Sequence, residues 1–67
     1  MTFNEAYKNM CLGHRVSHIS FVDGEYIYID KNCIIRDESN YNLEDWYEFN
    51  KDNDNFQYGW NIYSYED

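Results

Sequence analysis

The chain lacks proline and has only three glycines among its 67 residues. With eight tyrosines, four phenylalanines and two tryptophans, that composition excludes a flexible linker or a low-complexity disordered segment. Two cysteines allow at most one disulfide, which excludes a disulfide-stapled scaffold. No apolar run is long enough to suggest a membrane span, and nothing resembles a signal peptide. We therefore expect a reduced, cytoplasmic protein that does not enter a membrane.

The length allows one domain, which we expect to comprise residues 1–67. A domain of this size buries only about 60% of the surface that its unfolded chain exposes, so its stability is marginal. Additional support has to come from elsewhere, since at most one disulfide can form. We expect it from self-association into a homo-oligomer, most simply a dimer.

Basic residues are scarce, with five lysines and arginines against thirteen acids and a net charge of −8. Residues 1–36 are electrically balanced, with four acids and four bases. Residues 37–67 hold nine acids, and their only base is Lys51. Such a segment repels nucleic acid, which argues against direct nucleic-acid binding. It attracts and steers a partner protein that has a basic surface.

Residues 2–12 are expected to form the first helix. Thr2 and Glu5 have the spacing of a capping box, and Gly13 stands where the helix should end. The apolar positions recur with helical spacing, which predicts a buried stripe of Phe3, Ala6, Tyr7, Met10 and Cys11.

Residues 15–22 and 25–30 have the pattern of two strands joined by Asp23-Gly24. This dipeptide favours a two-residue type I′ hairpin, which would place Val16 opposite Lys31 and His18 opposite Ile29. In that register both faces of the hairpin carry apolar side chains. One face needs the helix, and the other needs a second chain, a ligand or the C-terminal segment.

A third strand is expected at residues 33–36, after a tight turn at residues 31–32. Ile34 would then share a face with Ile29, and Ile35 would lie on the opposite face.

Asn42 is a candidate cap for a short second helix, whose N-terminal end would carry Glu44 and Asp45. The final strand is expected at residues 60–65, with Trp60 and Ile62 pointing inward. The inner stripe of the second helix would consist of Leu43, Trp46, Tyr47 and Asn50. The predicted fold class is α+β: an N-terminal helix packed on a small antiparallel sheet, formed by a meander of three strands plus a C-terminal strand, with the second helix before the last strand.

No catalytic, cofactor or metal site is expected. The chain has neither a glycine-rich phosphate loop nor a nucleophile elbow, and its carboxylates lie on solvated segments. His14 and His18 would lie about 13 Å apart on a strand, too far to share an ion with Cys11 and Cys33. Residues 52–55 begin like a calcium loop, but a phenylalanine occupies the next ligand position.

The last 31 residues interleave nine carboxylates with nine aromatic residues. Two interpretations remain open: a solvated acidic face over an aromatic core, or a binding face in which acids surround aromatic anchors. In the second interpretation the candidate contacts are the acids Asp37, Glu38, Glu44, Asp45, Glu48, Asp52 and Asp54, and the anchors Trp46, Tyr47 and Phe56.

Three segments resemble a widespread family of small phage and prophage proteins: M-x-F-x-E-A-x-x-x-M-x-x-G at residues 1–13, the tyrosine-rich run at 25–30, and W-N-I-Y at 60–63. This family includes the Thoeris anti-defence sponges, which sequester cyclic-ADP-ribose-type immune signals as oligomers. The resemblance covers most of the chain and implies a phage-type protein acting in the host cytoplasm. Family members typically follow the glycine with several basic residues and a tryptophan, whereas residues 14–21 here read H-R-V-S-H-I-S-F.

Two functions are therefore weighed. The first is a non-catalytic counter-defence inhibitor whose acidic, aromatic half binds a basic surface of a host or defence protein, with DNA mimicry as one version. The alternative, implied by the resemblance, is a sponge for a cyclic nucleotide-type signal. Its donors would be Arg15, His18, Lys31 and Arg36, and its stacking rings would be Phe21, Tyr26 and Tyr28.

Overall fold

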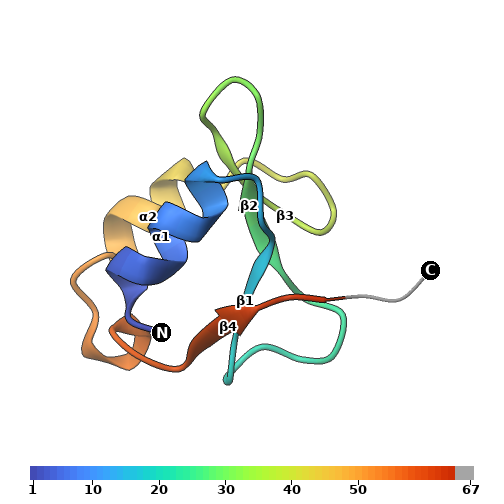
Figure 1. Cartoon of the computed structure of the whole chain (residues 1–67). Helices are drawn as coiled ribbons and strands as arrows, with labels where there is room; N and C mark the ends of the chain where they lie inside the picture. The colour runs from blue at the N-terminus through green and yellow to red at the C-terminus, as the bar shows by residue number, and fades with distance from the viewer. Residues whose placement is uncertain (65–67) are drawn as a thin grey trace.

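The structure is a computed structural model that describes residues 1–64. Two helices lie on one side of a four-stranded antiparallel sheet (Figure 1), which confirms the predicted α+β class. The strand order is β3-β2-β1-β4, so the final strand pairs with the first. The elements are α1 (Phe3–Cys11), β1 (Val16–His18), β2 (Ile27–Ile29), β3 (Ile35–Asp37), α2 (Glu44–Asn50), the 3₁₀ turn η1 (Asp54–Phe56) and β4 (Trp60–Ile62).

Helix α1 has the predicted caps at both ends. The Thr2 backbone N–H donates to Glu5 Oε1 at 2.8 Å, and the Glu5 N–H donates to Thr2 Oγ1 at 3.2 Å. The backbone hydrogen bond from Thr2 lowers the pKa of Glu5 below its ordinary value. At the other end, the Gly13 N–H donates to the Met10 carbonyl and the His14 N–H to that of Asn9, the pattern of a Schellman motif.

The inner face of α1 is narrower than its sequence pattern predicts. Phe3, Ala6 and Met10 are buried as expected. Tyr7 is 37% exposed and stacks at 5.8 Å on Tyr47 of α2. Cys11 was expected in the core but is exposed, because it lies at the last turn of α1, beyond this buried face.

The first two strands pair in a different register from the predicted one. Val16 pairs with Ile27 instead of Lys31. Residues 19–26 therefore form a long connection, and Asp23-Gly24 is not the loop of a two-residue hairpin. A turn does form there, since the Glu25 N–H donates to the Val22 carbonyl at 3.0 Å. It is not type I′, because Gly24 has φ +90° while Asp23 is not among the described residues with positive φ.

The long connection arises because β1 ends at His18. The His18 ring accepts the Ser20 N–H at Nδ1, and its Nε2–H donates to the Tyr58 carbonyl at 2.7 Å. The next residue, Ile19, donates its N–H to Gly59. These bonds direct the chain toward β4 after His18. The register changes by an even number of residues, so His18 and Val16 remain on the same face as Ile27.

The turn between β2 and β3 has three residues instead of the predicted two. The Asp30 N–H donates to the Ile34 carbonyl at 2.9 Å, and the Cys33 N–H donates to the Asp30 carbonyl. Cys33 has φ 64°, the left-handed conformation typical of such three-residue loops. One extra residue exchanges the faces of β3. Ile35 is therefore buried in the core while Ile34 is half-buried, and the prediction for both was wrong.

Helix α2 forms, but its cap position is Leu43 and not the predicted Asn42; Asn42 Oδ1 still accepts the Glu44 N–H at 2.8 Å. The expected inner stripe of α2 faces the core, with Leu43, Trp46 and Tyr47 packed against it and Asn50 buried.

Strand β4 ends at Ile62, earlier than predicted, and Tyr65 of the expected strand lies outside the described residues. Trp60 is buried as predicted. Ile62 pairs with the buried Val16 and so lies on the inner face of the sheet as predicted, but it stays 40% exposed because β4 is an edge strand.

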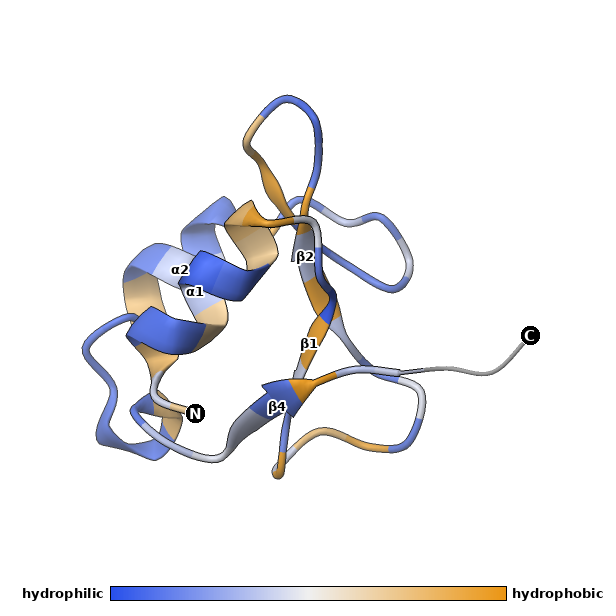
Figure 2. Ribbon diagram, in the orientation of Figure 1, coloured by the Kyte–Doolittle hydropathy of each residue, from blue (hydrophilic) through white to orange (hydrophobic). Residues whose placement is uncertain are grey.

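The core lies between the two layers. Apolar segments of α1, β1 and β2 are visible in Figure 2. Within residues 1–64, no helix is long and apolar enough to cross a bilayer. The buried apolar residues are Phe3, Ala6, Met10, Val16, Ile27, Ile35 and Trp60.

Candidate functional site

Six of the seven predicted contact acids are exposed, and five of them lie on α2 or shortly after it in the chain. Three of them belong to α2, whose seven residues therefore carry a dense negative charge. Two more follow α2 in the chain, and Glu38 lies in the loop before it. We call this set the acidic surface: Glu38, Glu44, Asp45, Glu48, Asp52 and Asp54.

The predicted aromatic anchors are half-buried and serve the core. Trp46 and Phe56 meet edge to face with ring centroids 5.3 Å apart. Tyr47 meets Phe3 at 5.8 Å, and Phe56 lies 4.8 Å from the His18 ring. These rings pack α2 and η1 against the core, so they do not protrude toward a binding partner.

Phe49 is the aromatic residue that protrudes from α2. Its side chain is 84% exposed. Asp45 precedes it by four residues on α2 and therefore lies beside it, and Asp52 follows in the turn after the helix ends. The sequence contained a signal for this exposure, because Phe49 falls outside the predicted inner stripe. Tyr41 and Tyr58 are also exposed, at 70% and 72%, but the sequence pattern did not single them out as exposed aromatic residues.

Lys51 neutralises part of the acidic surface. Its Nζ lies 3.1 Å from Glu48 Oε2, and this hydrogen bond raises the pKa of Lys51 above its ordinary value. Both side chains are largely exposed, so the pair adds little to stability. The other acids of the acidic surface form no ion pair within residues 1–64.

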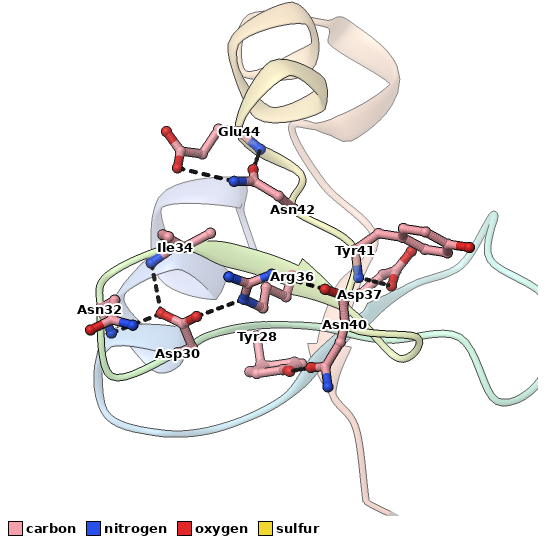
Figure 3. A network of polar contacts seen from close by, with 10 residues as sticks. All are labelled: Tyr28, Asp30, Asn32, Ile34, Arg36, Asp37, Asn40, Tyr41, Asn42 and Glu44. Carbon is pink, nitrogen blue, oxygen red and sulfur yellow. Dashed lines mark hydrogen bonds and ion pairs between the residues drawn. The ribbon is translucent and has the colours of Figure 1, made fainter.

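Asp37, the remaining predicted contact acid, is half-buried and organises the loop after β3 (Figure 3). Its Oδ1 accepts the N–H groups of Ser39 and Tyr41 at 2.9 and 3.1 Å. Asn40 in this loop accepts two hydrogen bonds from the sheet: Arg36 Nη1 donates to its carbonyl, and the Tyr28 hydroxyl donates to its Oδ1. The loop that carries Glu38 is therefore fixed to the sheet.

The residues of the alternative, nucleotide-binding reading are only partly brought together. The Arg15 guanidinium lies over the rings of Tyr26 and Tyr28, at 5.2 and 5.8 Å from their centroids. Arg36 pairs with Tyr28 across the strands. These four residues occupy the sheet face opposite the helices, which we call the outer face.

The other three residues of that reading lie elsewhere. His18 is 5% exposed and lies 4.9 Å from Trp60 in the core. Phe21 also packs on Trp60, edge to face at 5.7 Å. Lys31 is exposed in the turn between β2 and β3. The structure therefore does not assemble the seven residues into one site.

Arg36 is engaged by an ion pair with Asp30, which also caps the β2–β3 turn. Arg36 Nε lies 2.6 Å from Asp30 Oδ2, and Asp30 Oδ1 accepts the N–H groups of Asn32 and Ile34 (Figure 3). The hydrogen bond from Arg36, followed by the one from the Ile34 backbone, lowers the pKa of Asp30 below its ordinary value.

We expect Asp30→Asn to lower the free energy of unfolding at neutral pH. The difference from the unmodified protein should disappear in acid, where Asp30 itself becomes protonated. The lowered pKa means that Asp30 stabilises the fold fully above its unfolded pKa of about 3.9, and less as the pH falls through the lower folded value. The urea midpoints of the two proteins should converge as the pH falls from about 7 to about 3. Asp23→Asn, which removes an equal charge from the 19–26 loop, is the control. A gap that stays constant over this range would contradict the assignment.

Within the described part of the chain, no three histidine, cysteine or acidic residues are grouped closely enough to hold a metal ion. Cys11 and Cys33 are both exposed free thiols. No protein-family model, curated protein or solved structure matches the chain. The resemblance to small phage proteins therefore stays a prediction.

Proposed function

We propose that this chain is a non-catalytic inhibitor of the phage counter-defence type, which binds a basic surface of a host or defence protein through its acidic surface. The observation that carries the proposal is Phe49, whose side chain is 84% exposed on α2, one helical turn after Asp45. An aromatic ring inside a rim of charged groups has the composition of a binding hot spot. The ring adds nothing to the core, so burial against a partner is its most direct use.

Charge gives the proposal its specificity. A net charge of −8, concentrated in the second half of the chain, accelerates encounter with a basic surface and repels nucleic acid. A partner whose basic surface normally holds DNA would make the chain a DNA mimic, and inhibition through any other basic patch is the broader version. Exposed charges are screened over about 8–10 Å at physiological ionic strength, so association should slow steeply with salt.

The test is a pull-down of the tagged protein from host lysate at low and high salt, followed by mass spectrometry. We expect a basic protein that is retained at low salt and lost when Glu44, Asp45 and Glu48 are replaced together by Gln, Asn and Gln. Phe49→Ala should weaken binding of the recovered partner by about tenfold or more, as truncated anchors do. Leu12→Ala is the matched control, because Leu12 is 76% exposed and lies at the end of α1, outside the acidic surface.

A second candidate is sequestration of an anionic cyclic nucleotide on the outer face, favoured by the Arg15 guanidinium above two tyrosine rings. If no protein is recovered at either salt and a small nucleotide is retained, this candidate replaces the first. Self-association, most simply into a dimer, remains part of the proposal. The argument that the sheet has two apolar faces is weaker, because Ile35 belongs to the core and not to the outer face.

A further inference from the structure

A cleft of about 210 Å³ opens between the 19–26 loop, the β2 and β3 strands and the start of α2. Its apolar lining comes from Phe21, Ile27, Leu43 and Trp46. Pockets that enclose a drug-sized ligand have volumes of about 300–1,000 Å³. This cleft is smaller, so its size suits one protruding side chain and not a whole cofactor or nucleotide.

The charged groups that line the cleft are all acidic: Glu25, Asp37 and Glu38. Glu25 Oε1 accepts the Val22 N–H at 2.7 Å, and Asp37 Oδ1 accepts the backbone N–H groups of its own loop. Their second oxygens, and both oxygens of Glu38, accept no hydrogen bond from residues 1–64. The cleft thus offers several carboxylate oxygens to a ligand, and no basic residue lines it within that part of the chain.

We propose that the cleft receives an arginine side chain of the basic partner. An arginine stem is apolar and suits the lining, while its guanidinium stacks on aromatic rings and donates in pairs to carboxylates. Trp46 and Phe21 supply the rings. Lysine lacks the planar fork and stacks less well. This inference rests on the proposed function and adds the partner residue that the protein would recognise.

The cleft can be tested without any partner protein. N-acetyl-arginine amide is titrated into ¹⁵N-labelled protein, with the uncharged isostere N-acetyl-citrulline amide as the matched probe. We expect the arginine probe to shift the Trp46 indole N–H and the backbone amides of Tyr26 and Glu38, and the citrulline probe to shift none of them. Equal shifts with both probes, or arginine shifts that avoid the cleft, would overturn the proposal.

Two variants separate the cleft from general charge attraction. Glu38→Gln should weaken binding of the arginine probe about fivefold, the loss expected for one exposed charge pair. Asp23→Asn removes the same charge at a residue that neither lines the cleft nor belongs to the acidic surface, and it should leave the affinity unchanged. Both residues are exposed, so the variants should fold normally. Equal weakening by the two variants would overturn the proposal.

The inference and the proposed function can fail separately. If a basic partner is recovered but Glu38→Gln binds it as tightly as the unmodified protein, the cleft proposal falls and the proposed function stands. If the arginine probe occupies the cleft but no basic protein is recovered, the proposed function falls alone. If Glu38→Gln instead dissociates a dimer seen by light scattering, the occupant is a second copy of this chain and the proposal is overturned.

Discussion

Trp60→Ala is expected to remove much or all of the free energy of unfolding. Trp60 is 2% exposed, and its ring lies within 5.4 Å of Phe3 and 4.9 Å of His18, measured between ring centroids. Its Nε1–H donates to the Phe56 carbonyl at 2.7 Å. Truncating a buried tryptophan costs about 3–5 kcal/mol. A domain of this size has about 3–10 kcal/mol in total, so the loss removes much or all of it.

Urea unfolding followed by far-UV circular dichroism measures this loss. Phe49→Ala is the control, because it removes another large aromatic ring that is 84% exposed. Its free energy of unfolding should stay within about 0.5 kcal/mol of the unmodified protein. Similar losses for the two variants would mean that Trp60 is not the centre of the core.

Gly59→Ala should be the next most damaging single change, lowering the free energy of unfolding by about 2–4 kcal/mol. Gly59 has φ +91°, a backbone conformation that disfavours any side chain. A Cβ there would lie 3.0 Å from His18 Nε2 and 3.0 Å from Ile19 Cγ1. His18 could yield only by weakening its hydrogen bond to Tyr58, whereas the Ile19 side chain is 78% exposed and can rotate away.

Gly24→Ala provides a matched control for the backbone contribution. Gly24 has φ +90°, but a Cβ on it would meet nothing within 4 Å. Alanine there should cost only the backbone strain, about 1–2 kcal/mol. Chemical denaturation of the two variants gives the difference that belongs to the His18 contact. If Gly59→Ala is no worse than Gly24→Ala, the β1–β4 junction is less tightly packed than these distances imply.

The features that the sequence predicted correctly depend on neighbours within one or two turns of the chain. Thr2 and Glu5 lie three residues apart, and their reciprocal bonds follow from that spacing alone. The sheet faces of Val16 and Ile27 were also predicted correctly, because alternation does not depend on the register as long as the shift is even.

The errors arose where distant contacts outweigh local preference. Asp23-Gly24 favours a tight hairpin, but bonds from His18 and Ile19 to residues 58 and 59 end β1 first. Cys33 gives no sequence signal for a left-handed residue, since glycine and asparagine are usual there. That single residue decided whether Ile34 or Ile35 entered the core.

The sequence predicted correctly that the acids of the candidate site are exposed, but it did not predict which aromatic residues are exposed beside them. Acids such as Glu44 and Glu48 are exposed, as their positions on a short helix suggested. The aromatic residues were assigned by density alone, and the tertiary contacts of Trp46 with Phe56 take it inward. Phe49 was left outside the inner stripe by helical periodicity and still went unrecognised. The cleft required the fold itself, because its walls come from four separate segments.

The pairing of β1 with β4 also determines when this chain can acquire its structure. His18 must meet Trp60, and the Phe3 N–H must reach the Gln57 carbonyl, before the centre of the sheet and the start of α1 are fixed. Contacts between such distant positions close large loops, which slows folding relative to a helical bundle of similar length. During synthesis the first fifty residues can form little beyond α1 and the β2–β3 hairpin. The native core therefore assembles only after β4 has left the ribosome.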